Sequence, residues 1–148
     1  YNYVIDAVDT VTAKIQLVMA CQAAGTPIIS SMGAGNKLDP TKFQVADIYQ
    51  TSIDPLARVM RRELKKRQVK HLKVVYSTEE ALTPLTDEED KVSAEGIAPD
   101  VEHISKRRST PGSVAFVPSV AGLIIGGEVI KDLTKDAMRR ARAGSLNI

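Results

Sequence analysis

The stretch YVIDAVDTVTAKIQLVMACQAAGTPIISSM (residues 3–32) contains the pattern that decides the fold. Residues 3–8 are mostly apolar and short enough for a buried strand, and residues 28–32 read as another short strand. Between them, residues 10–24 carry apolar side chains at helical spacing. A strand, a helix and a strand in this order predict a βαβ unit, whose two strands run parallel.

Local signals mark both ends of the helix expected in this unit. Thr10 is expected to cap its N-terminus, because a threonine hydroxyl can accept a backbone N–H that has no partner within the helix. Val11, Ile15 and Val18 are expected to form its inward face. Gly25 should end the helix, because glycine adopts the left-handed conformation at little cost.

The next part of the chain predicts three more elements. Residues 43–51 indicate a strand after a loop that is rich in turn formers. Asp54 and Pro55 indicate a helix start, with the aspartate as cap and the proline in the first turn. That helix is expected to end near Arg67, and residues 71–77 predict another strand.

The last third of the chain shows less periodicity. Residues 79–112 form a long crossover-type loop in our interpretation, and residues 113–117 indicate a strand. A glycine-containing helix is expected over residues 119–133, followed by a basic tail over residues 134–148. We therefore expect one α/β domain over residues 1–148, with a mixed sheet flanked by helices.

Composition limits the class of protein. The 148 residues carry a net charge of +2, too small to indicate a polyanionic partner without local clustering. The one cysteine, Cys21, forms no intrachain disulfide and fits a reducing compartment. No apolar run approaches the roughly 18 residues of a membrane span. These features favour a cytoplasmic protein that does not enter a membrane.

Asp9 is the first candidate for chemistry. It follows the first expected strand, and open α/β sheets bind ligands outside the carboxyl ends of their strands. A carboxylate at that place can hold Mg²⁺, although it could also serve only to cap the following helix.

Lys14 lies just over one helical turn further on, where it could reach a phosphate or stay in solvent. Asp6 lies inside the strand and is interpreted as structural. The chain contains no glycine-rich phosphate loop of the GxxxxGK[ST] type.

Clusters of basic residues suggest contact with a nucleic acid, although a solvated helix face explains any single cluster equally well. The candidate RNA or substrate contacts are Arg61, Arg62, Lys65 and Lys66 on the second helix, and Lys106, Arg107 and Arg108 in the long loop.

Several motifs resemble one protein family. These are the VIDAVD strand end, the GAGNKLDPT loop, the DPLA helix start, VVYSTEEALTP, and the helix after TPGSVAFVPS. Together they resemble the HesA/MoeB/ThiF superfamily, which is related to the ubiquitin-activating enzymes, and within it the tRNA threonylcarbamoyladenosine dehydratase branch. The absence of cysteine from residues 79–112, and of paired CxxC motifs, favours this branch.

The resemblance implies a fold, a reaction and site residues. It implies the second half of a Rossmann-like ThiF/MoeB-type domain, and the use of ATP and Mg²⁺ to adenylate the carboxylate of threonylcarbamoyladenosine in tRNA. The activated group then cyclises with net loss of water. Asp9 matches the aspartate that binds Mg-ATP in the family and carries the catalytic role, and Lys14 matches a basic residue at the cofactor. The resemblance also implies a homodimer.

The resemblance also implies that part of the family's domain is missing. Residue 1 corresponds to the start of the family's second half, so we expect a C-terminal portion that is inactive without its N-terminal half. One alternative is an enzyme of the same class that adenylates a sulfur-carrier protein. The other is a noncatalytic dimerisation or interaction module.

Overall fold

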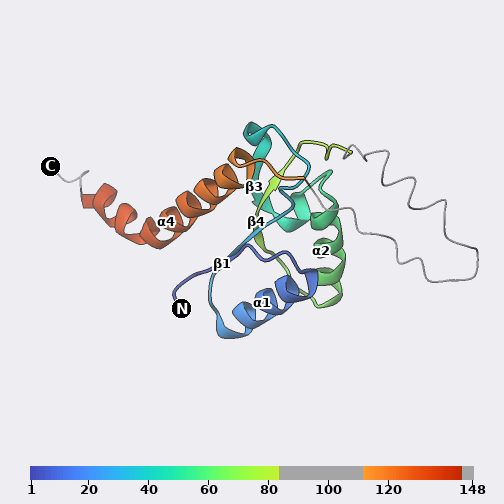
Figure 1. Ribbon diagram of the computed structural model, residues 1–148. Coiled ribbons are helices and arrows are strands. Elements are labelled where there is room, and N and C mark those ends of the chain that lie inside the picture. The colour runs from blue at the N-terminus through green and yellow to red at the C-terminus, as the bar shows by residue number, and fades with distance from the viewer. Residues whose placement is uncertain (84–111, 145–148) are drawn as a thin grey trace, which may run out of the picture.

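The computed structural model describes residues 1–83 and 112–144 (Figure 1). Its centre is a four-stranded sheet in the order β1-β2-β4-β3. The strands are β1 (Val4–Asp6), β2 (Ile28–Ser31), β3 (Phe43–Asp47) and β4 (Lys73–Ser77). β1, β2 and β4 run parallel, and β3 pairs antiparallel with β4 at the edge. The expected α/β fold with a mixed sheet is therefore confirmed.

Helix α1 (Val11–Ala24) connects β1 to β2, which confirms the βαβ unit. Gly25 has a φ of 64°, and its N–H reaches the carbonyls of Cys21 and Gln22, as expected for a glycine at a helix C-terminus. Thr10 occupies the N-cap, but its side chain makes no capping hydrogen bond, so that part of the prediction is wrong.

The middle of the chain follows the prediction with one correction. Asp54 caps helix α2 (Pro55–Lys66) by accepting the Ala57 N–H at 2.8 Å. The strand expected over residues 43–51 ends at Asp47. There, the Asp47 carboxylate accepts the N–H groups of Tyr49 and Leu72, and the chain turns into a short 3₁₀ helix over Ile48–Gln50.

Helices cover both faces of the sheet (Figure 1). On one face, α1 and α2 bury side chains such as Val18 and Met60 against Val74 of β4. On the other face, the first turns of α4 (Phe116–Gly144) pack on Ile29 and Val75. The sheet is thus the middle layer of three, and its strand ends remain available on one side for a site.

The strand expected over residues 113–117 is wrong, because α4 begins at Phe116. Val117, Ala121 and Ile125 are buried at a spacing of four residues, so the apolar run belongs to a helix face and not to a strand. Pro118 fits the first turn, where its missing N–H has no helical partner. The helix also continues past Leu133 to Gly144, into the region expected to be a basic tail.

An ionic cluster joins α4 to the sheet. Lys73 Nζ of β4 lies 2.6 Å from Glu128 Oε2 and 3.0 Å from Asp132 Oδ2. The hydroxyl of Tyr3 also donates to Asp132, at 2.7 Å. Hydrogen bonds from Lys131 and then Lys73 lower the pKa of Glu128, and hydrogen bonds from Tyr3 and Lys73 lower the pKa of Asp132.

Across residues 1–83 and 112–144, no helix is long and apolar enough to cross a membrane.

We predict that this cluster makes stability depend on pH. Because the folded-state pKa values of Glu128 and Asp132 lie below their ordinary values of 4.5 and 3.8, the stabilisation is present above those values and is lost as pH falls through the lowered ones. Lys73→Met should lower the free energy of unfolding by roughly 1 kcal/mol at pH 7. Urea unfolding should show that this difference shrinks toward pH 3.

The control is Lys70→Met, since Lys70 is an exposed lysine near the same strand. It should change stability little at either pH. A Lys73→Met effect that stays constant from pH 7 to pH 3 would contradict the proposed linkage.

Candidate functional site

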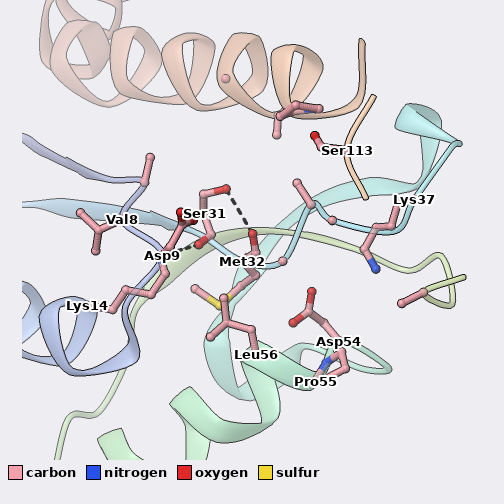
Figure 2. A pocket seen from close by; sticks show the side chains of 18 of the residues that line it. Val8, Asp9, Lys14, Ser31, Met32, Lys37, Asp54, Pro55, Leu56 and Ser113 are labelled. Carbon is pink, nitrogen blue, oxygen red and sulfur yellow. Dashed lines mark hydrogen bonds between the residues drawn. The ribbon is translucent and has the colours of Figure 1, made fainter. Parts of the chain in front are cut away.

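A cavity of about 950 Å³ lies at the carboxyl ends of β1 and β2. Its walls come from the loops after these two strands, the start of α2 and the first turns of α4 (Figure 2). This is the place where open α/β sheets bind their ligands. Asp9 and Lys14, the two cofactor residues expected from the sequence, both line it.

Asp9 stands in the loop after β1, and its side chain is exposed at the cavity. Thr10, not Asp9, occupies the N-cap of α1. A solvated carboxylate at the edge of a cavity is available for a cation or for a ligand that brings one. Its position therefore fits the magnesium role expected for it.

Lys14 is buried, with only 1% of its surface exposed, so the expectation that it could be a solvated lysine is wrong. Its ammonium group lies 3.1 Å from Asp6 Oδ2, 3.3 Å from Ser30 Oγ and 2.7 Å from the Ser31 carbonyl oxygen. An ammonium has three protons, and these three acceptors use all of them. Contact between Lys14 and a cofactor stays a prediction, since its donors are already bound within the protein.

Asp6 is the partner that sequence reasoning did not assign to Lys14. It is fully buried, and its Oδ2 also accepts a hydrogen bond from Ser30 Oγ. Its other oxygen accepts the Val8 N–H at 3.1 Å, within the loop that carries Asp9. A carboxylate on the buried face of a strand was the available signal, because a buried charge requires a partner.

The other end of the cavity carries a second pair of polar side chains, Lys37 and Asp54 (Figure 2). Lys37 is 4% exposed and donates to the Glu79 carbonyl oxygen at 3.0 Å. Asp54 is 1% exposed and caps α2 through Oδ1. The Glu79 carboxylate accepts two N–H groups from the loop after β2, those of Leu38 and Asp39, and so holds that loop in place. From the sequence, Asp54 was expected only to cap a helix, and no role was expected for Lys37.

The basic residues of α2 are not equivalent. Arg61 is partly buried and donates to the Thr51 carbonyl at 2.8 Å, so its guanidinium is committed to the fold. Arg62, Lys65 and Lys66 are exposed. Arg62 and Lys66 both lie beside Glu63, as does Arg67, and hydrogen bonds from Lys66 and Arg67 lower the pKa of Glu63 to about 2. Lys106, Arg107 and Arg108 lie outside the described residues.

Comparison with known proteins identifies similar chains. No protein-family model matches the sequence. A tRNA threonylcarbamoyladenosine dehydratase of Bacillus subtilis (strain 168) is 49% identical over 136 residues, covering 91% of this chain and 52% of that protein. The dehydratase of Escherichia coli (strain K12) is 40% identical over 95 residues, covering 59% of this chain and 35% of that protein.

Solved structures of a tRNA threonylcarbamoyladenosine dehydratase also resemble this chain. The crystal structure of E. coli tRNA N6-threonylcarbamoyladenosine dehydratase, TcdA, in complex with AMP has a TM-score of 0.72 at 28% identity, covering 94% of this chain and 51% of that one. The complex of the same enzyme with ATP has a TM-score of 0.70. The chain thus spans about half the length of these proteins, as a C-terminal portion would.

The fold is that of a ThiF/MoeB-type Rossmann-like domain. Within that class, the chain is homologous to part of the tRNA threonylcarbamoyladenosine dehydratases, which confirms the resemblance expected from its motifs.

We predict that Lys14 positions the site through its ion pair. Lys14→Met leaves Asp6 buried without its counter-charge and should lower the free energy of unfolding by about 3–5 kcal/mol. The double variant Lys14→Met/Asp6→Leu removes both charges and should recover most of that loss. Urea unfolding of the wild type, both single variants and the double variant measures this coupling. If the free energy lost by the double variant equals the sum of the losses in the two single variants, the coupling between Lys14 and Asp6 is contradicted.

Proposed function

We propose that this chain is the part of a tRNA threonylcarbamoyladenosine dehydratase that places a carboxylate next to ATP. The observation that carries the proposal is the cavity at the ends of β1 and β2, lined by Asp9, in a chain homologous to these enzymes. The related E. coli structures that hold ATP and AMP support a nucleotide as ligand. Because the chain covers about half of its relatives, the activity belongs to the whole protein.

The proposed reaction follows from the chemistry of carboxylates. A carboxylate is a poor acyl donor, so one of its oxygens first attacks the α-phosphorus of ATP, and pyrophosphate leaves. A nucleophile within the same threonylcarbamoyladenosine then attacks the acyl carbon and closes a ring. AMP leaves with the former carboxylate oxygen. The net change at the nucleoside is the loss of water.

Asp9 is the residue of this chain that would hold Mg²⁺. Within residues 1–83 and 112–144, no group of three or more acidic, histidine or cysteine side chains could bind a metal alone. This fits Mg²⁺, which commonly binds one or two carboxylates and completes its shell with substrate phosphates and water. When bound, Mg²⁺ neutralises phosphate charge and favours departure of pyrophosphate. Lys14 and Asp6 would keep the Asp9 loop in position.

Transfer RNA is the proposed macromolecular substrate, and it places the activity in the cytoplasm. The exposed side chains of Arg62, Lys65 and Lys66 on α2 support contact with its phosphates. Arg61 supports it less, because its guanidinium is bonded to Thr51. Lys106, Arg107 and Arg108 remain candidates for the same role.

A second copy of the chain is the other proposed partner. Leu123, Ile130 and Leu133 are exposed on α4, with 76%, 62% and 56% of their surface accessible. Apolar side chains gathered along an exposed helix commonly mark a protein contact. This observation supports a homodimer, and it supports equally the alternative of an interaction module. The relatives named above are tRNA dehydratases, which favours tRNA over a sulfur-carrier protein as the substrate.

We predict that Asp9→Asn weakens binding of Mg-ATP at least ~10-fold, because the variant loses one charged ligand of the cation. Binding of ATP without Mg²⁺ should change much less. Isothermal titration measures both, first with this chain and then after addition of the remaining half of the domain. Affinity should appear or increase on that addition.

Glu80→Gln is the matched control, since Glu80 is an exposed carboxylate that does not line the cavity. It should leave both affinities unchanged. Equal Mg-ATP affinity of the wild type and Asp9→Asn in the complemented protein would sink the role of Asp9.

A further inference from the structure

Asn36, in the loop after β2, holds three parts of the chain together. Its backbone N–H donates to the Gly112 carbonyl oxygen at 2.8 Å, and its side-chain Oδ1 accepts the Gly112 N–H at 2.6 Å. Its carbonyl oxygen accepts the Leu82 N–H at 2.7 Å. Leu82 and Gly112 flank residues 84–111, which lie outside the described part of the chain. One residue therefore joins the segment after β4 to the segment that leads into α4.

The position of Asn36 makes two chemical demands. Its backbone has a φ of 57°, in the left-handed region that most residues avoid and that asparagine, aspartate and glycine enter more easily. The Gly112 N–H also needs a side-chain acceptor close to that backbone. Asparagine and aspartate satisfy both demands, glycine satisfies only the first, and alanine satisfies neither. Substitutions at residue 36 can therefore separate the backbone conformation from the side-chain hydrogen bond.

The hydrogen bonds of Asn36 lie at the edge of the cavity. Its neighbour Lys37 lines the cavity, and so do Gly112 and Ser113 on the segment that Asn36 binds. Figure 2 shows Lys37 and Ser113 at the end of the cavity away from Asp9. The two hydrogen bonds between Asn36 and Gly112 therefore set the distance between two parts of the cavity wall.

Gly112 depends on these hydrogen bonds more than the rest of the wall does. The first turns of α4 are held by apolar packing, because Val117 and Ala121 are buried against the sheet. Gly112 and Ser113 precede them and are exposed. Glycine has no side chain to pack, so the hydrogen bonds to Asn36 attach Gly112 to the loop after β2. Because hydrogen bonds between exposed groups add little to stability, their main effect is on the position of the wall.

We propose that Asn36 is a positioning residue for the reaction, because its hydrogen bonds to Gly112 hold this part of the cavity wall in the place that the reacting groups require. Asn36 does not itself line the cavity, so it acts through Gly112. Reacting atoms must be held within a narrow range of distances, and a shift of about 1 Å in their surroundings can lower the rate strongly. The link to catalysis rests on the proposed function, whereas the joining of the two segments rests on the hydrogen bonds alone.

The test uses this chain together with the remaining half of the domain, ATP, Mg²⁺ and tRNA that contains threonylcarbamoyladenosine. Asn36→Gly keeps the backbone conformation and removes the Oδ1 acceptor. It should lower kcat for cyclisation about 10-fold and change KM for tRNA and for ATP by less than about 3-fold, because binding is retained while the reacting groups are misplaced. Asn36→Asp retains an acceptor and should keep kcat within about 3-fold of the wild type.

Gln68→Gly is the matched control. Gln68 also has a positive φ, 58°, and is exposed just after α2, where it does not line the cavity. Because a new glycine increases the freedom of the unfolded chain at either position, this variant reproduces that effect of Asn36→Gly without a change at the cavity. It should leave kcat and both KM values unchanged.

Amide hydrogen exchange tests the joining of the two segments without a ligand. In Asn36→Gly, the Gly112 amide loses its acceptor and should exchange about 10-fold faster. The Leu82 amide keeps the backbone carbonyl of residue 36 as its acceptor and should exchange as in the wild type. Urea unfolding of the same variants measures stability, and the midpoints of Asn36→Gly and Gln68→Gly should be close to each other.

The outcomes separate this inference from the proposed function. A kcat of Asn36→Gly equal to that of the wild type, or an equal loss of kcat in Asn36→Gly and Asn36→Asp, would overturn the inference and leave the proposed reaction intact. A loss of kcat together with an unfolding midpoint far below that of Gln68→Gly would also overturn it, since Asn36 would then serve only the fold. Absence of cyclisation by the wild-type protein would overturn the proposed function and the positioning role with it. Faster exchange of the Gly112 amide in Asn36→Gly would still show that Asn36 joins the two segments.

Discussion

The buried ion pair between Lys14 and Asp6 joins three elements of the fold at the point where the site begins. Asp6 ends β1, Lys14 belongs to the first turns of α1, and the ammonium also reaches Ser30 and Ser31 at the end of β2. Two charges removed from water are stable only when each has partners in good geometry. The pair therefore fixes how the helix leaves the sheet, and with it the loop that carries Asp9.

This constraint explains the shape of the cavity. The ends of β1 and β2 form its floor, the start of α2 forms one wall, and α4 packs across the other face of the sheet and contributes its first turns. Each wall contributes polar groups of a different kind. Asp9 is exposed and able to bind a cation, whereas Asp54 and Lys37 are buried and hold the start of α2 and the loop after β2 in place.

Much of the fold was predictable because its signals are local. Gly25 and the Asp54-Pro55 pair mark helix ends through backbone chemistry that does not depend on the rest of the protein. Residues 113–117 were misassigned because a short apolar run fits a strand or a helix equally well, and packing on Ile29 and Val75 decides between them. The position of Asp9 could be predicted from its strand. The burial of Lys37 could not, because a lysine among turn-forming residues looks solvated until the fold brings the Glu79 carbonyl oxygen next to it.

If a carboxylate is adenylated in this cavity, one of its oxygens must pass to AMP, and an oxygen label follows that transfer. The chain would be used together with the remaining half of the domain, with ATP, Mg²⁺ and tRNA whose threonylcarbamoyladenosine carries ¹⁸O in its carboxylate. We expect the AMP produced to gain one ¹⁸O atom, and Asp9→Asn to abolish this transfer. Cyclised product formed together with unlabelled AMP would contradict it, because the carboxylate oxygen would then not have bonded to phosphorus.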